Sequence, residues 1–127
     1  MKLLLDTHTF LWGFSNNPRL SRKAGLGLAD ESNQVYLSAA SVWEIALKTA
    51  KGNLVLAEPL EKIMIGIEER GLTHLPVTWE HAVKVQSIPM HHRDPFDRIL
   101  AAQAMVEGLV LVTADKIFKK YGVSVLW

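Results

Sequence analysis

The chain alternates short apolar runs with segments of helical periodicity, and this alternation constrains its fold more than any other feature. The clearest run is Leu109–Val112, and Leu3–Leu5 near the N-terminus is a second one. Continuous apolar runs of this length are typical of parallel strands, which helices cover on both faces. Strands that alternate with helices form right-handed βαβ units. The pattern therefore predicts an α/β fold, a three-layer α/β/α sandwich with a central parallel sheet.

Helix caps and turn residues divide the chain into elements, with no repeat, linker or low-complexity segment between them. The expected strands, about five in number, are Lys2–Leu5, Val35–Leu37, Leu72–Val77, Leu109–Thr113 and Val123–Leu126. The expected helices are His8–Phe14, Ser21 to about Glu31, Ser38 or Ser41 to about Lys51, Pro59 to Gly71, Trp79–Ser87, Asp94 to about Gly108, and Lys116–Tyr121.

Length and composition limit the kind of protein this can be. The 127 residues fit one domain, spanning 1–127, that is large enough to bury a core. The chain has no cysteine, which excludes disulfides and thiolate metal ligands. No apolar run approaches the roughly 18 residues of a membrane span. The run that follows Met1 and Lys2 is too short for a signal peptide. We therefore expect a soluble protein of the cytoplasm.

The charges are nearly balanced overall, with 14 Lys and Arg residues against 13 Asp and Glu residues. If four of the acids belong to a metal site, as argued below, the remaining surface is basic. Such a surface attracts a polyanion toward a site whose own negative charge is neutralised by metal. An ordinary solvated surface of mixed charge is the alternative explanation.

Four acidic residues stand at positions that a parallel sheet would bring to one edge. Asp6 ends the first apolar run, and two residues separate Asp115 from Leu109–Val112. Glu44 and Asp97 lie in the first two turns of predicted helices. The carboxyl ends of strands and the helix N-termini that follow them share one edge, where ligands bind. Carboxylates gathered there repel one another unless a cation neutralises them. This predicts Mg²⁺ or Mn²⁺, which prefer oxygen ligands, and chemistry on a phosphate.

Three of these acids also fit ordinary helix stabilisation. Asp6 can cap the first helix, and Asp115 can cap the short helix that follows it. Glu44 closes a capping box if Ser41 is the N-cap, and it can pair with Lys48 one turn later. Because each explanation holds for a single residue, the case for a site depends on the sheet edge that the acids share.

Ionisable residues are dense in the segment His91–Arg98, which holds two acids, two histidines and two arginines. Asp94 precedes a proline, which is a strong N-cap signal, so this acid is expected to be structural. Asp97 lies in the first helical turn, where the helix dipole favours a negative charge. The two histidines show no metal-ligand spacing, and His8 is a better candidate for a substrate contact. The density nevertheless favours a functional segment over a plain connection.

Four short segments resemble the motifs of PIN-domain nucleases, in the family's order and at its usual spacing. They are Leu3–His8 (LLLDTH), Ser41–Ile45 (SVWEI), Asp94–Ala104 (DPFDRILAAQA) and Val112–Asp115 (VTAD). Within that family the chain looks most like the VapC-type toxins of bacterial toxin–antitoxin modules. Each motif is short, but four of them along the full length are highly specific.

The resemblance implies a five-stranded parallel sheet and an endoribonuclease that depends on Mg²⁺ or Mn²⁺, with one or two ions. It also implies a homodimer and inhibition by a cognate antitoxin, through which the toxin reaches operator DNA. Carried over by motif, the catalytic acids are Asp6, Glu44, Asp97 and Asp115, of which Asp6, Asp97 and Asp115 would hold the metal. The residues expected to support these acids or to contact substrate are Thr7, His8, Lys48, Asp94, Arg98 and Thr113.

Two positions depart from the family's pattern. His8 stands where many members have Asn or Ser. Lys116 stands where a further acid often follows Asp115, and the absence of that acid favours a site with one metal ion. Two other functions remain open. A metal-dependent phosphatase of doubly wound fold usually needs an acid two residues after its nucleophile, and that position after Asp6 is His8. A catalytically inactive regulator would bind the antitoxin without cleaving RNA.

Overall fold

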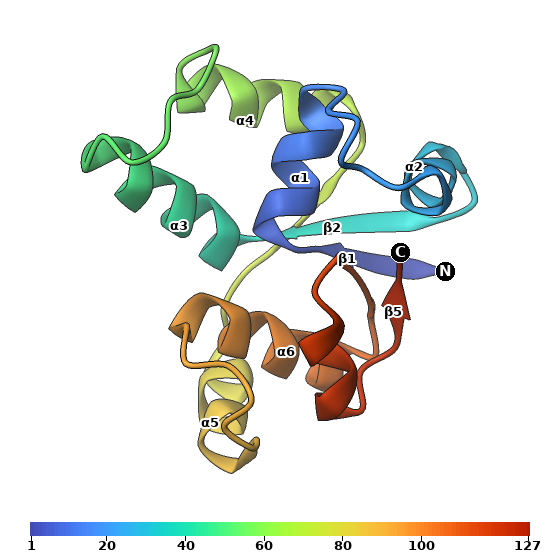
Figure 1. Cartoon of the computed structure of the whole chain (residues 1–127), viewed down its shortest axis with the longest axis vertical. Helices are drawn as coiled ribbons and strands as arrows, with labels where there is room; N and C mark the ends of the chain where they lie inside the picture. Colours follow the sequence, from blue (N-terminus) through green and yellow to red (C-terminus); the bar gives the residue numbers. More distant parts are fainter.

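A computed structural model describes residues 1–127 and contains one five-stranded sheet in which every neighbouring pair of strands is parallel (Figure 1). The strands are β1 (Lys2–Leu5), β2 (Gln34–Ser38), β3 (Thr73–Leu75), β4 (Val110–Val112) and β5 (Val125–Leu126). Their order across the sheet is β3-β2-β1-β4-β5, so β1 occupies the centre. The predicted α/β class, with a central parallel sheet of five strands, is confirmed.

Helices cover both faces of the sheet (Figure 1). One layer contains α1 (Thr7–Phe14), α2 (Arg22–Ala29), α3 (Ala39–Ala50) and α4 (Leu60–Glu69). The other contains α5 (Trp79–Ser87), α6 (Pro95–Glu107) and the 3₁₀ helix η1 (Lys116–Tyr121). None of these helices combines the length and the apolar character that crossing a membrane requires.

The central strand separates two hydrophobic clusters, because successive side chains of a strand point to opposite faces. Leu3 and Leu5 pack with residues of the first layer, such as Ile45 of α3. Leu4 packs with residues of the second layer, such as Leu100 of α6. All three leucines are buried, and burial of each contributes about 1.5–3 kcal/mol to stability. Because both faces of β1 are buried, Leu3–Leu5 form an uninterrupted apolar run in the sequence.

The strand order reverses beside β1, and this reversal positions the site. The chain moves outward from β1 through β2 to β3 and then returns to the other side of β1 as β4. The connections on the two sides of β1 therefore use opposite helical layers. In open α/β sheets, ligands bind outside the carboxyl ends of the strands at such a reversal. Here that place is defined by Asp6, which follows β1, and by Thr113, which follows β4.

Several boundaries differ from those that the sequence predicts. Ser38 is the N-cap of α3, its hydroxyl accepting from the amide of Ala40, so the capping box from Ser41 to Glu44 is not formed. The strand expected over Leu72–Val77 is shorter, because the Leu72 amide bonds back to α4 and Pro76 has no N–H for the ladder. These shifts leave the order of the elements unchanged.

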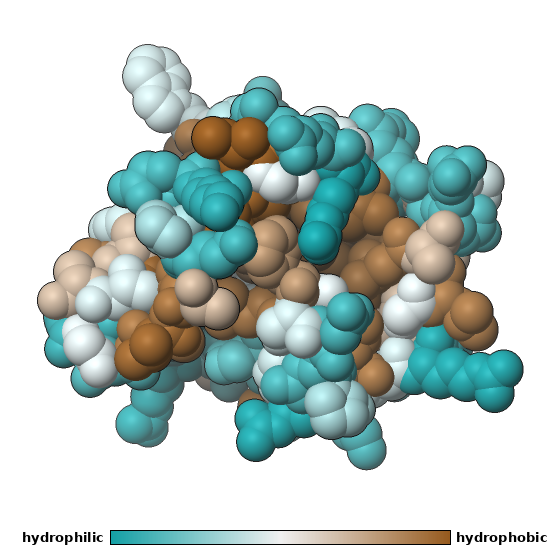
Figure 2. Space-filling model, turned by 90° about the horizontal axis from the view of Figure 1, so that it is seen from above, coloured by the Kyte–Doolittle hydropathy of each residue, from teal (hydrophilic) through white to brown (hydrophobic).

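Figure 2 views the molecule from the side of α1–α4 and shows apolar surface between hydrophilic side chains. An apolar hollow of about 370 Å³ lies between α1, α2 and α4, lined by residues such as Phe10, Phe14 and Leu28. A second, more open groove of about 590 Å³ follows the end of α3 and the loop to α4, where Val55 is 89% exposed. Exposed apolar surface of this kind is typical of places where a partner binds.

Candidate metal centre

Asp6 connects the ends of the two central strands. Its Oδ1 accepts a hydrogen bond of 2.7 Å from the Thr9 amide, so Asp6 caps α1 as the sequence allows. Its Oδ2 accepts from the hydroxyl of Thr113 just beyond β4. The same hydroxyl oxygen accepts from the Asp115 amide at 3.0 Å. Thr113 therefore fixes Asp6 and Asp115 relative to each other, although they are 109 positions apart in the sequence.

Glu44 is almost completely buried in the second turn of α3, with 4% of its surface exposed. Its Oε1 accepts from the Thr7 hydroxyl at 2.7 Å, and its Oε2 lies 2.6 Å from Nζ of Lys48. The hydrogen bond to Glu44 raises the pKa of Lys48 against the opposing effect of burial. The predicted pairing of Glu44 with Lys48 is thus confirmed, and it balances a buried charge that would otherwise be costly.

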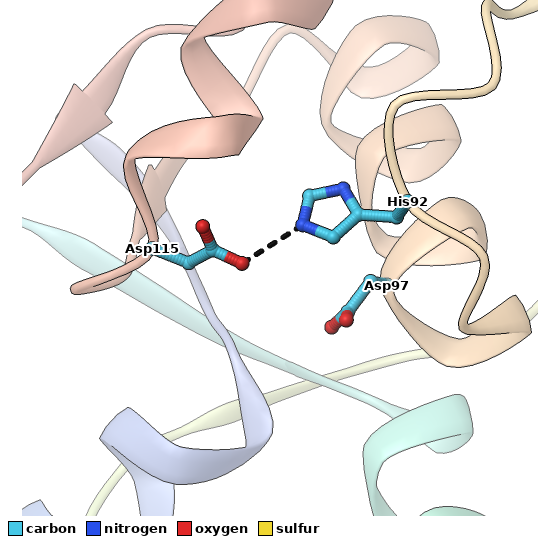
Figure 3. Close-up of side chains that lie close together, drawn as sticks. All are labelled: His92, Asp97 and Asp115. Atoms are coloured by element: carbon cyan, nitrogen blue, oxygen red, sulfur yellow. Dashed lines mark hydrogen bonds and ion pairs between the residues drawn. The ribbon is translucent and has the colours of Figure 1, made fainter.

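Asp97, Asp115 and His92 form the tightest group of possible metal ligands. One ligand atom from each lies within 4.8 Å of the others. Figure 3 shows the Asp97 carboxylate directed into the space beside the contact between His92 and Asp115. In that contact, Nε2 of His92 lies 2.8 Å from Oδ2 of Asp115. The other oxygen of Asp115 accepts from the Ile117 amide, so Asp115 caps η1 as well.

The electrostatics of this group show an excess of negative charge around Asp97. Burial raises the pKa of Asp97 to about 6, and the charge of Asp94 adds to the shift. Glu44 and Asp115 act in the same direction, whereas His92 opposes it. Burial also disfavours ionised Asp115, but the hydrogen bonds from His92 and the Ile117 amide outweigh it and lower the pKa of Asp115. The charges of Glu44 and Asp115 therefore both act on Asp97 across one site.

This arrangement fits a hard divalent cation. A positive ion beside Asp97 would favour its ionised form and reverse the shift that burial imposes. Carboxylate oxygens from Asp97 and Asp115 are the ligands that Mg²⁺ and Mn²⁺ prefer, and imidazole is also compatible with Mn²⁺. Asp6, predicted from the sequence to be a direct ligand, lies outside the tight group and reaches it through Thr113. Glu44 also lies outside the tight group.

The remaining predicted site residues divide into two sets. Thr7, Lys48 and Thr113 each hold one of the acids through the hydrogen bonds described above. Asp94 caps α6, its Oδ1 accepting from the Phe96 amide at 2.9 Å, as predicted. His8 is exposed, with its ring 5.8 Å from that of Trp12.

Arg98 holds the loop that precedes α6. Its guanidinium donates to the carbonyls of Pro89 at 3.0 Å, Val85 at 3.1 Å and Ile88 at 3.4 Å. The side chain is buried, and these bonds bind the end of α5 and the loop after it to α6. The role of Arg98 in the structure is therefore to fix the loop that carries His92.

His92 is the residue that the sequence does not distinguish. It is 7% exposed and packs against Phe118 and Tyr121, whereas its neighbour His91 is exposed. Two adjacent histidines carry no ligand spacing, and the partners of His92 come more than 20 positions later. His81 is likewise fully buried and bonded through Nε2 to Glu107 at 2.9 Å. Both histidines contact residues far along the chain, so no local spacing predicts either contact.

Comparison with known proteins identifies the family. Residues 3–123 match the PIN domain, so the chain belongs to the PIN-domain family. It is 28% identical to Ribonuclease VapC22 of Mycobacterium tuberculosis over 115 residues, which cover 90% of this chain and 87% of that protein. Its fold is similar to VapBC2 from Rickettsia felis (TM-score 0.73, 16% identity, 98% and 97% of the two chains covered). VapBC from Salmonella typhimurium is also similar (TM-score 0.68, 22% identity, 98% and 96% covered).

Proposed function

We propose that this protein is a metal-dependent endoribonuclease that hydrolyses RNA phosphodiesters as the toxin of a toxin–antitoxin pair. The observation that carries the proposal is the pair of carboxylates Asp97 and Asp115, with oxygens within 4.8 Å of each other beside His92, at the sheet edge where Asp6 also lies. Membership of the PIN-domain family and similarity to a protein named as a ribonuclease support it. Cellular RNA as substrate would place the protein in the cytoplasm.

Asp97 and Asp115 would hold a Mg²⁺ or Mn²⁺ ion, and Asp6 would complete the site or hold its waters. When bound, the ion lowers the pKa of a water and neutralises the charge that builds on the phosphate. We propose one ion, because Lys116 adds a positive charge beside Asp115 where a second ion would need another acid. Thr113 keeps Asp6 and Asp115 at a fixed separation, so the site is formed before substrate arrives.

Glu44 would position the attacking water. Each carboxylate oxygen has about two lone-pair positions, and Thr7 and Lys48 each occupy one on their oxygen. The carboxylate can therefore accept a further hydrogen bond from a water while its orientation stays fixed. Alignment of that water with the scissile phosphate is where such positioning contributes to the rate. The Lys48 side chain is 43% exposed, so its ammonium would be available to a phosphate oxygen of the substrate.

Cleavage of RNA by the Asp6→Asn variant tests the proposal. We expect wild-type protein with Mn²⁺ to cut single-stranded RNA internally, and the folded variant to be slower by at least about 100-fold, because the metal site loses a charge. Asp30→Asn is the matched control, since Asp30 is an exposed acid outside the site. A folded Asp6→Asn protein that cleaves at the wild-type rate would show that Asp6 is not part of the active site.

The antitoxin is the protein partner that we propose. The similar structures from R. felis and S. typhimurium are VapBC complexes. In this chain, the groove at the end of α3 is lined by Leu54, Val55 and Leu56, which offer apolar surface to such a partner. The homodimer stays a prediction. Sedimentation analysis of the purified protein tests it, and a single species of 14.2 kDa at micromolar concentration would contradict it.

Two alternatives predict different measurements. A phosphatase would release inorganic phosphate from a phosphomonoester, whereas the proposed enzyme cuts within an RNA chain. The position where a phosphatase needs its second acid holds the exposed His8, which disfavours that chemistry. A catalytically inactive regulator would show no heat of Mn²⁺ binding in a calorimetric titration, whereas the proposed nuclease binds the ion without RNA.

A further inference from the structure

We propose that Tyr121 and His92 form a hydrogen-bonded relay that orients Asp115 for metal binding, so that His92 is a positioning residue of the centre. This inference rests on the proposed function only in taking Asp115 as a metal-binding carboxylate. It assigns a role to a histidine and a tyrosine that are not among the four predicted catalytic acids.

The hydrogen-bond pattern determines which nitrogen of His92 carries the proton. The Tyr121 oxygen accepts from the backbone N–H of His92 at 2.7 Å, so its own hydrogen is free to point elsewhere. Nδ1 of His92 lies 3.3 Å from that oxygen and can accept this hydrogen. Asp115 is a carboxylate at neutral pH and has no proton to donate. Nε2 must therefore carry the proton and donate it to Oδ2 of Asp115 at 2.8 Å.

Packing fixes the imidazole in this orientation. Its ring is stacked on Tyr121, with 5.5 Å between centroids and an angle of 10° between planes. On Phe118 the separation is 4.5 Å. The backbone of the His92 loop is held by Arg98, which donates to carbonyls on both sides of the turn out of α5. His92 is thus constrained by its ring, its backbone and both of its nitrogens, whereas the side chain of Asp115 is 38% exposed.

The relay leaves Asp115 able to bind an ion. Oδ2 accepts from His92 and Oδ1 from the Ile117 amide, and each oxygen keeps a lone pair. Figure 3 shows one oxygen of Asp115 directed at His92, with the Asp97 carboxylate beside this contact. Hydrogen bonds to a ligand that fix its orientation change metal affinity by about 10–100-fold when they are removed. A donor in this position also keeps the imidazole nitrogen from binding the ion itself.

Metal titration of three variants, without RNA, tests the relay. His92→Phe keeps a ring and removes the donor, and we expect Mn²⁺ affinity measured by calorimetry to fall by about 10–100-fold. In His92→Gln the amide nitrogen stands near the position of Nε2, so affinity should stay close to the wild-type value. Tyr121→Phe removes only the hydroxyl and should give an intermediate loss, which keeps the test valid if His92→Phe does not fold. Circular dichroism confirms that each variant compared is folded.

A spectroscopic readout separates positioning from structural support. Nitrogen-15 NMR of the metal-free protein should show a proton on Nε2 of His92. A proton on Nδ1 alone would overturn the relay, and so would unchanged Mn²⁺ affinity in folded His92→Phe or absence of Mn²⁺ binding by the wild type. Pulsed EPR of bound Mn²⁺ should show no directly coordinated imidazole nitrogen, and such a coupling would make His92 a ligand instead.

The outcomes for the relay and for the proposed function are distinguishable. Wild-type protein that binds Mn²⁺ but leaves RNA intact would remove the proposed nuclease and leave the relay standing. Folded His92→Phe protein with wild-type affinity would remove the relay and leave the nuclease standing.

Discussion

Replacement of Asp97 by Asn should make the metal-free protein more stable while removing its activity. Burial and neighbouring acids raise the pKa of Asp97 from its ordinary 3.8 to about 6, so the ionised form is disfavoured in the folded protein. A difference of about two pKa units corresponds to about 3 kcal/mol at neutral pH. Solvent screening reduces this energy, because Asp97 is only half-buried. The substitution also removes the favourable interaction of the Asp97 charge with the helix dipole, which lowers the gain by about a further 0.3–1 kcal/mol. We expect a net gain of about 1–2 kcal/mol.

The sign of the pH dependence follows from the raised pKa. Well below pH 3.8, Asp97 is protonated in both the folded and the unfolded protein, so it does not lower the stability of the fold. As the pH rises from 3.8 to about 6, the unfolded chain ionises while the folded one stays protonated, so stability is lost until both are ionised. The stabilisation in Asp97→Asn should therefore be largest at pH 7.5. At pH 4.5 it should fall to about one third of that value.

Urea unfolding in EDTA measures this effect. With a urea slope of about 2 kcal/mol per M, the midpoint of Asp97→Asn should rise by about 0.5–1 M at pH 7.5. Asp30→Asn is the matched control, because hydrogen bonds from Ser32 lower the pKa of Asp30 and its neutral replacement should not stabilise the fold. If Asp97→Asn is less stable than the wild type at pH 7.5, the negative charges of the metal-free site do not destabilise the fold, and the reasoning is refuted.

Two further substitutions test the supports of the centre. Thr113→Val removes the hydroxyl that joins Asp6 to Asp115 and keeps the shape of the side chain. We expect the free energy of unfolding in urea to fall by about 1–3 kcal/mol and the Mn²⁺ affinity to fall about tenfold. Unchanged affinity would mean that the two acids need no such connection. Arg98→Met leaves three carbonyls, at the end of α5 and in the loop after it, without their donor and should cost about 2–4 kcal/mol in the same unfolding measurement. Hydrogen exchange should increase in residues 88–93, and protection equal to wild type would exclude the proposed hold on the loop.

The fold was predictable from the sequence because its signals are local. Leu3–Leu5 and Leu109–Val112 are apolar throughout, and this is what burial on both faces of a parallel sheet requires. The N-cap Asp94 also appears where expected. The start of α3 was ambiguous, because Ser38 and Ser41 are equally good caps by residue type. Only the end of β2 at Ser38 decides between them.

The site was predictable to the extent that topology alone determines it. Asp6 and Asp115 follow the two strands at the reversal, so their proximity follows from strand order. The contact of His92 with Asp115 depends on a buried loop and on Tyr121, and no sequence interval encodes it. The hydrogen bond from the Thr113 hydroxyl to Asp6 likewise joins residues far apart in the sequence, and direct binding of the metal by Asp6 stays a prediction.

The central claim is that Asp97 and Asp115, together with Asp6, form a divalent metal centre that cleaves RNA. Removing the metal and then adding it back tests this claim most directly. Purified protein is incubated with a labelled single-stranded RNA in Mn²⁺, in EDTA, and in EDTA followed by excess Mn²⁺. We predict internal cleavage in the first sample, none in the second and recovery in the third, with Asp97→Asn inactive in all three. Cleavage in EDTA at the rate seen with Mn²⁺ would contradict the claim.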